Sequence, residues 1–92
     1  MGIQKLEDLE IYNIALDLAV WVYDVLEEFP DYERYNVIDQ LRRSSSFVAA
    51  NIAEGFGRYY YKENRLFCRR ARGSLLEVKH WFIFSLRRKY IQ

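Results

Sequence analysis

Residues that make tight turns are scarce in this sequence, which has one Pro and four Gly among its 92 residues. An all-β domain needs many such turns, so the composition predicts that helices dominate. The single cysteine, Cys68, cannot form an intramolecular disulfide, and no Cys or Cys/His group has the spacing of a metal site. A reducing compartment is therefore expected.

Long apolar runs are also missing. No uncharged apolar stretch approaches the ~18 residues that span a bilayer. The N-terminus does not show the basic, apolar and small-residue order of a signal peptide. We therefore expect a cytoplasmic protein that does not contact the membrane.

Hydrophobic and aromatic residues are abundant, at 51% and 17%, which is enough to build the core of a single domain over residues 1–92. The charge is distributed unevenly. Residues 1–39 hold ten acids and two bases, whereas residues 40–92 hold three acids and twelve bases. This asymmetry indicates either an anionic partner for the basic half or docking of one copy on another.

Apolar residues recur at spacings of three and four along three segments, which is the period of an α-helix. The pattern predicts helices over residues 6–29, ended by Pro30, over residues 33–54, with Gly55 as a left-handed cap, and over residues 61–90. Residues 55–58 should form a short loop. The predicted core positions are Ile11, Ile14, Leu18, Val22, Val25, Phe29, Tyr35, Ile38, Leu41, Val48, Ile52, Phe67, Ala71, Leu75, Val78, Phe82 and Leu86.

The second half of the segment 61–90 carries more apolar residues than two neighbouring helices can cover. Four of them lie well off the predicted core stripe: Leu76, Trp81, Ile83 and Phe84. Either a fourth helix or other subunits must cover them, and we interpret them as an oligomer interface.

Gly73 lies in the middle of the same segment, where glycine costs about 1 kcal/mol relative to alanine. Close packing can offset this cost. We therefore predict that Gly73, with Ala71 and Ser74, marks a tight crossing with the small residues of the segment 33–54, and that Gly73→Leu would unfold or disassemble the protein.

Three motifs carry a resemblance to a known family. They are Gln40-Leu41-Arg42-Arg43-Ser44-Ser45, Asn51-Ile52-Ala53-Glu54-Gly55 and Ala71-Arg72-Gly73-Ser74-Leu75-Leu76-Glu77. In this order and spacing they resemble the bacterial 23S rRNA intervening-sequence proteins, from about residue 5 to the end. The motif residues given structural roles are Gln40, Arg43, Asn51, Glu54, Gly55, Gly73, Ser74 and Glu77.

The resemblance implies an all-α fold, an up-and-down antiparallel bundle of the four-helix type that forms a ring-like homopentamer. In this chain the fourth helix would be short or absent. A similar fold occurs in accessory proteins of diversity-generating retroelements, which bind a reverse transcriptase and nucleic acid. By analogy, the resemblance makes nucleic-acid binding an expectation here, although a shared fold does not establish a shared function.

Cations and tyrosines gather at the loop and along one side of the segment that follows it. The candidate nucleic-acid-binding residues are Arg58, Tyr59, Tyr60, Lys62, Arg65, Arg69 and Arg72. Cations neutralise phosphates and tyrosine rings stack on unpaired bases, so this combination favours RNA or single-stranded DNA as a partner. Two structural interpretations stay open: a solvated helix face, or salt bridges to the acidic side of residues 6–29 in a neighbouring copy.

Asn51 and Glu54 share one face at the end of a predicted helix, where a carboxylate opposes the helix dipole. An arginine, either Arg43 or Arg58, is expected to stabilise Glu54 together with backbone donors of the following loop. A contact with a ligand or partner is the alternative.

Catalytic arrangements are not apparent. His80 is the only histidine, and Cys68 has no histidine at helical spacing to activate it. Glu77 and His80 match one Glu-x-x-His element, but a di-iron bundle needs two such elements and two further glutamates, so a metal site is a remote possibility. We expect a homo-oligomeric scaffold without cofactor or catalytic residues, with a purely structural or protein-binding module as the alternative.

Overall fold

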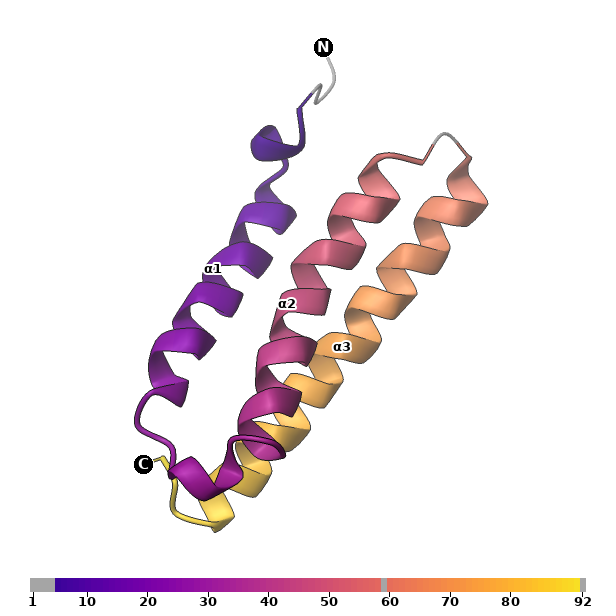
Figure 1. The fold of residues 1–92 in the computed structure, drawn as a ribbon. Helices are drawn as coiled ribbons and strands as arrows, with labels where there is room; N and C mark the ends of the chain where they lie inside the picture. Colours follow the sequence, from indigo (N-terminus) through magenta and orange to yellow (C-terminus); the bar gives the residue numbers. More distant parts are fainter. Residues whose placement is uncertain (1–4, 59, 92) are drawn as a thin grey trace.

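The computed structural model describes residues 5–58 and 60–91, and these residues form an all-helical chain (Figure 1). Its α-helices are α1 (Glu10–Leu26), α2 (Val37–Phe56) and α3 (Tyr61–Arg87). Short 3-10 helices precede the first two, η1 (Leu6–Asp8) before α1 and η2 (Asp31–Glu33) before α2. The predicted all-α class is confirmed, and the described residues contain no fourth helix.

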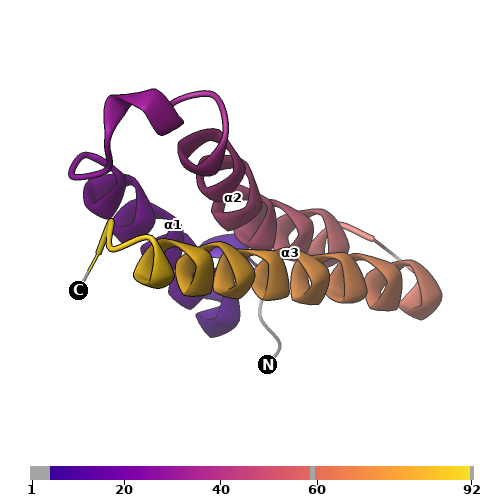
Figure 2. The same ribbon diagram turned by 90° about the horizontal axis from the view of Figure 1, so that it is seen from below.

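Successive helices run in opposite directions, so α1 and α3 point the same way and α2 runs back (Figure 1). α2 packs against both neighbours. α1 and α3 approach each other at the end that holds the C-terminus, where the rings of Trp21 and Phe82 are 5.7 Å apart between centroids. Toward the other end they diverge (Figures 1 and 2). The result is an elongated molecule of 47 × 21 × 19 Å.

The main hydrophobic core lies where the three helices converge. Its buried residues are Val22, Leu26, Phe29, Val37, Ile38, Leu41 and Val78. The buried residues of a smaller cluster come from α1 and α2 alone and are Ala15, Val48 and Ala49. Because small side chains dominate this second cluster, it buries less apolar area than the main core.

Several predicted core positions are exposed. Between 47% and 60% of the accessible surface remains on Ile11, Ile14, Leu75 and Leu86. The buried side of α1 consists instead of Ala15, Ala19, Val22 and Leu26. The core assignment of the four exposed residues is wrong because helical period identifies an apolar side, not the part of it that a neighbouring helix covers.

The helix starts differ from the sequence prediction. η1 occupies the first residues of the segment predicted to be the first helix, and η2 occupies the predicted start of the second. Pro30 opens the η2 turn by accepting a hydrogen bond from the backbone N–H of Glu33 at 3.0 Å. The chain then reverses before α2, which leaves Tyr35 89% exposed rather than inward.

Gly55 lies inside α2 and does not form a left-handed cap. The helix continues to Phe56, and Gly57 follows with φ −77°. The cap prediction is wrong, as is a loop starting at residue 55. A Cβ on Gly55 would lie 3.1 Å from the Cβ of Phe67, so α2 and α3 approach each other closely at this point and a larger residue would crowd them.

Gly73 is exposed and is not part of a helix crossing. A Cβ built on Gly73 has no atom within 4 Å, so the predicted tight crossing is wrong at this residue. Ala71 is buried and Ser74 is half-buried, so the covered side of α3 lies beside Gly73 without including it. The expected unfolding by Gly73→Leu loses its basis in packing within one chain.

α3 ends at Arg87 because a left-handed residue stops it before Tyr90. Lys89 has φ 64°, and the backbone N–H of Tyr90 donates to the carbonyl of Ser85 at 2.9 Å, as in a Schellman motif. The Tyr90 hydroxyl then donates to Oε2 of the buried Glu33 at 2.5 Å. This bond is the main reason that the pKa of Tyr90 rises to about 12.

Candidate interaction surfaces

The predicted cationic stripe lies on the outward side of the first half of α3. Spacings of three and four residues place its members together, on the side of the helix away from the buried Ala71 and Val78. We call this surface the basic face; it consists of the exposed residues Lys62, Arg65, Arg69 and Arg72. Tyr60, just before the helix, is 66% exposed. Tyr59 lies outside the described residues.

Arg58 has a different environment from the basic face. Its Nη2 lies 3.2 Å from Oε2 of Glu54, and its guanidinium carbon lies 4.9 Å from the ring centroid of Phe67. Arg70 lies 5.0 Å from the same ring. Arg58 therefore links the end of α2 to the first turns of α3 and has a carboxylate partner within its own chain.

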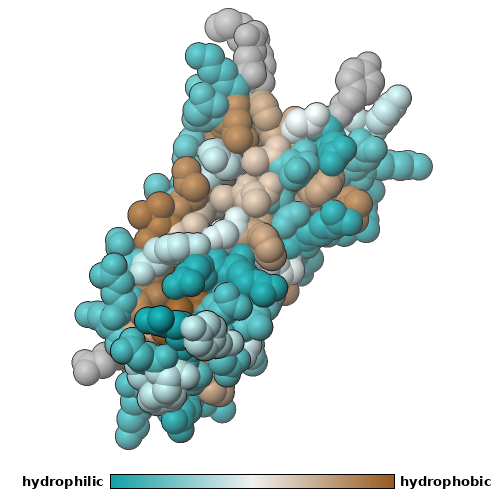
Figure 3. All heavy atoms as spheres, viewed as in Figure 1, coloured by the Kyte–Doolittle hydropathy of each residue, from teal (hydrophilic) through white to brown (hydrophobic). Residues whose placement is uncertain are grey.

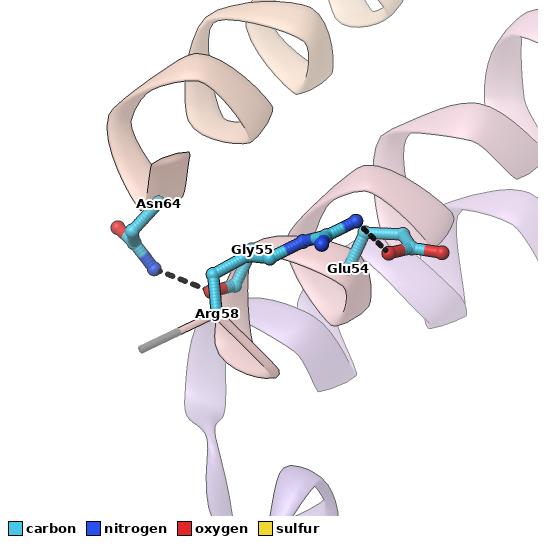
Figure 4. Close-up of polar contacts among 4 residues, drawn as sticks. All are labelled: Glu54, Gly55, Arg58 and Asn64. Atoms are coloured by element: carbon cyan, nitrogen blue, oxygen red, sulfur yellow. Dashed lines mark hydrogen bonds and ion pairs between the residues drawn. The ribbon is translucent and has the colours of Figure 1, made fainter. Parts of the chain in front are cut away.

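Glu54 and its neighbours form a set of polar contacts at the α2–α3 connection (Figure 4). Arg58 pairs with Glu54, and the side-chain amide of Asn64 donates to the carbonyl of Gly55 at 2.8 Å. The positive charge of Arg58 offsets the unfavourable position of a carboxylate at a helix C-terminus. Because both side chains of the ion pair are substantially exposed, it contributes at most about 1 kcal/mol.

Three other motif residues make their contacts within α2. Arg43, the alternative partner for Glu54, lies 3.5 Å from Asp39 instead. The Asn51 side chain donates to the carbonyl of Phe47 at 2.8 Å, one turn earlier in α2. Gln40 is half-buried, and its carbonyl accepts a hydrogen bond from the Ser44 hydroxyl at 2.7 Å. These bonds lie within α2.

The predicted oligomer interface on α3 divides into two pairs. Leu76 and Ile83 are 57% and 44% exposed on the outer side of the helix. Trp81 and Phe84 are half-buried, with their rings 5.6 Å apart, and pack against the main core of their own chain. The indole N–H of Trp81 is buried without a hydrogen-bond partner. The surface of a single chain therefore offers Leu76 and Ile83 more fully than the aromatic pair.

An apolar groove lies between α1 and α3 in the half of the molecule where these helices diverge. Its volume is about 390 Å³, and its lining comprises Ile11, Ile14, Ala15, Leu18, Val48, Ile52, Cys68, Ala71, Arg72 and Leu75. α2 contributes the floor and the other two helices the walls. The residues lost from the predicted core, Ile11, Ile14 and Leu75, are in these walls. The apolar period of the sequence shows that these residues share an apolar side of their helix. It does not show that no neighbouring helix covers that side.

The outer side of α1 is acidic. Its exposed carboxylates at helical spacing are Glu10, Asp17 and Asp24, and the exposed Glu28 lies just beyond its C-terminal end. On the face shown in Figure 3, hydrophobic residues are visible along α1. Hydrophilic residues dominate the outer edge of the N-terminal part of α3. The charge asymmetry of the sequence thus becomes an acidic ridge on one outer helix and a basic face on the other.

The residues considered for metal or nucleophilic chemistry are not brought together. Glu77 and His80 are exposed, and the His80 ring packs edge-on against Trp81 with centroids 4.8 Å apart. Across residues 5–58 and 60–91, no three His, Cys, Asp or Glu side chains are grouped to hold a metal ion. The Cys68 thiol donates to Oδ1 of Asn64 at 3.7 Å, and no side-chain base contacts it within the same ranges.

A membrane-spanning role also lacks support in the described ranges, where no helix has the length and apolarity that a bilayer crossing requires. A comparison with curated proteins finds no match. A scan against protein families matches residues 7–92, nearly the whole chain, to the 23S rRNA-intervening sequence protein. This match agrees with the three helical motifs and with the all-α architecture, and the chain belongs to the 23S rRNA-intervening sequence protein family.

Proposed function

We propose that this protein is a non-catalytic, homo-oligomeric helical scaffold of the cytoplasm that binds single-stranded nucleic acid through its basic face. The observation that carries this proposal is the gathering of Lys62, Arg65, Arg69 and Arg72 on one exposed side of α3. A protein that processes nucleic acid is an alternative ligand for the same surface.

The dimensions of the basic face suit a flexible strand. Residues 62–72 extend over roughly 15 Å of helix, so their cations can follow several successive phosphates. Tyr60, which is 66% exposed, lies at the N-terminal end of this row, and tyrosine is a residue type on which unpaired bases stack. Arg58 adds positive charge nearby, although its pairing with Glu54 reduces its contribution.

Self-association is supported by the apolar surface that a single chain leaves uncovered. Leu76 and Ile83 are exposed on α3, and the α1–α3 groove has apolar walls. Contiguous exposed apolar surface of this kind usually marks an interaction site. An oligomer would also repeat the basic face, which raises the apparent affinity for a long strand.

The test is a titration of fluorescently labelled single-stranded RNA and DNA, read by anisotropy at several salt concentrations from about 50 mM upward. Replacing Arg65, Arg69 and Arg72 by alanine should weaken binding and reduce the slope of log K against log salt by about 2, at about 0.7 per lost phosphate contact. A matched control replaces Arg34, Arg43 and Arg87, which are exposed elsewhere, and removes the same net charge.

Three outcomes are distinguishable. Loss of binding in the first variant but not in the control supports the basic face. Equal loss in both variants points to net charge rather than this surface. No binding at low salt, with self-association intact, supports the second candidate, a structural or protein-binding module that uses the exposed apolar residues.

A further inference from the structure

A second apolar strip lies on α1, on the side away from the groove. It consists of Leu16, Val20 and Tyr23, which are 41%, 58% and 45% exposed, and we call it the α1 strip. Positions two apart on a helix differ by about 200°, so Leu16 and Val20 point away from Leu18, which lines the groove. A hollow of about 310 Å³ in the α1 strip is lined by Ala19, Val20, Tyr23 and Asp24. α1 therefore offers apolar contact area on a side distinct from the groove.

The border of the α1 strip is acidic. Asp17, Asp24 and Glu27 are exposed beside it at helical spacing. At its C-terminal end lies a second hollow, and the charged residues in its lining are Asp24, Glu27, Asp31, Arg34 and Arg42. The guanidinium carbon of Arg42 lies 5.7 Å from the ring centroid of Tyr23. Together these four carboxylates and two guanidinium groups give the border a net negative charge.

The second half of α3 has an exposed apolar strip of its own. Leu76 and Ile83 are 57% and 44% exposed, and we call them the α3 strip. They come two positions before the buried Val78 and Ser85, so they point away from the core. Their spacing of seven residues matches that of Leu16 and Tyr23 in the α1 strip.

The border of the α3 strip is basic. Lys79 comes three residues after Leu76 and Arg87 four residues after Ile83, so both cations are neighbours of the strip, and both are exposed. Glu77 is the one acid in residues 74–91, and it lies about a quarter of a helical turn away from Leu76. The α3 strip therefore carries the charge opposite to that of the α1 strip.

Charge determines which strips can meet. Two α1 strips would bring carboxylates together, and two α3 strips would bring cations together, whereas an α1 strip and an α3 strip are complementary. The two strips belong to the two outer helices of the chain (Figure 1). A contact between them joins different surfaces of two copies, so each copy keeps one free strip for a further neighbour. Such a head-to-tail contact gives a closed ring when the rotation between copies allows it.

We propose that the α1 strip of one copy docks on the α3 strip of the next, so that copies of this chain associate head to tail. This inference rests on the self-association in the proposed function and names its two surfaces. Docking places Ile83 against the hollow beside Val20 and brings Lys79 and Arg87 opposite the acidic border of the α1 strip. The contact covers exposed apolar area on both helices.

Nucleic-acid binding is compatible with this contact. Lys62, Arg65 and Arg69 come seven or more residues before Leu76. This separation is roughly 10 Å or more along α3. The first half of α3 therefore stays accessible to a polyanion while the second half docks on a neighbouring copy.

The experiment measures molar mass by sedimentation equilibrium for wild type, Val20→Arg, Ile83→Glu and an equimolar mixture of the two variants. Val20→Arg brings a cation opposite the basic border of the α3 strip, and Ile83→Glu brings a carboxylate opposite the acidic border of the α1 strip. Each variant alone should therefore associate at least tenfold more weakly than wild type. In the mixture, the intact α1 strip of one variant meets the intact α3 strip of the other, so association should return.

Leu66 provides matched controls because it is 42% exposed on α3, ten residues before Leu76. Leu66→Arg and Leu66→Glu make the same chemical changes outside both strips and should leave the mass of the assembly unchanged. Circular dichroism checks that all variants fold, which is expected because Val20 and Ile83 are both exposed.

Recovery of association on mixing supports the inference, because a contact of either strip with itself cannot produce it. A wild type that is monomeric at every concentration overturns both this inference and the proposed self-association. An assembly that survives Val20→Arg or Ile83→Glu overturns this inference alone, because the strip concerned is then outside the contact. A mixture that stays monomeric also overturns it, as does an equal loss of association in the Leu66 controls.

Discussion

Replacing Gly55 by alanine tests how closely α2 and α3 approach each other. The added Cβ would lie 3.1 Å from the Cβ of Phe67 and 3.4 Å from the carbonyl oxygen of Asn64. Carbon atoms pack best at about 3.5–4.0 Å. Both neighbouring atoms are held by the α3 backbone, so α3 must move away by a few tenths of an ångström.

Gly55→Ala has two opposing effects on the free energy of unfolding. Overpacking of this kind costs about 1–3 kcal/mol, whereas replacing a glycine inside a helix returns about 0.5–1 kcal/mol. The net result for Gly55→Ala is a loss of about 1 kcal/mol, which lowers the melting temperature by roughly 4–8 °C in a domain of this size.

Two other glycines provide matched controls. Gly73→Ala gains the helix propensity without a clash, since nothing lies within 4 Å of its Cβ, and should stabilise the fold by about 0.5–1 kcal/mol. Gly57→Ala makes an ordinary contact at 3.7 Å with the Glu54 carbonyl and should change stability by less than about 0.5 kcal/mol.

The assay is thermal unfolding followed by circular dichroism, with all variants at one protein concentration because association shifts the melting temperature. The expected order is Gly73→Ala above wild type, Gly57→Ala close to it and Gly55→Ala below it. A Gly55→Ala protein that melts at or above wild type would refute the close approach of the two helices.

Other contacts predict smaller or sharper effects. Tyr90 has a folded-state pKa of about 12, above its ordinary value of 10.0. Its hydrogen bond to Glu33 therefore stabilises the fold below pH 10, and this stabilisation is lost as the pH rises toward 12. In alkaline denaturation, the free energy of unfolding of Tyr90→Phe should depend less on pH between 10 and 12 than that of the wild type. Glu54→Gln should cost less than about 1 kcal/mol in urea unfolding, because its ion pair is exposed. Asn64→Ala removes one of two donors to the Gly55 carbonyl, which keeps the Arg58 backbone N–H at 3.1 Å, and should cost about 0.5–1.5 kcal/mol in the same assay. Leu41→Ala, at a fully buried position, should cost about 2–5 kcal/mol.

The presence of three helices follows from the sequence because the apolar period of 3.6 residues depends on local spacing alone. Helix ends were less predictable, since contacts between distant segments set them. α3 ends at Arg87 with the left-handed Lys89, and Tyr90 after it bonds Glu33, which is 57 residues earlier. No pattern within the last helix contains that information.

The candidate surfaces were likewise predictable from the sequence only where local spacing determines them. The positions of Lys62, Arg65, Arg69 and Arg72 on one side of α3 follow from their spacing, and the structure places them on that side. The groove did not follow, because period assigns Ile14 to an apolar stripe without showing whether a neighbouring helix covers it. Gly73 was misread for a related reason: the cost of a helical glycine suggests a close neighbour, but none exists within the chain.

The three sides of α3 are suited to three separate tasks. The side bearing Val78 contributes to the core, and the side bearing Leu75 lines the groove. Arg69 lies on the third side, away from the core and outside the groove lining. Arg69 can therefore face a polyanion without disturbing the apolar walls, whereas Arg72 belongs to the basic face and also lines the groove. Under the proposed function, a charge change at Arg69 should therefore act on nucleic-acid binding, and an apolar change at Leu75 should act on self-association.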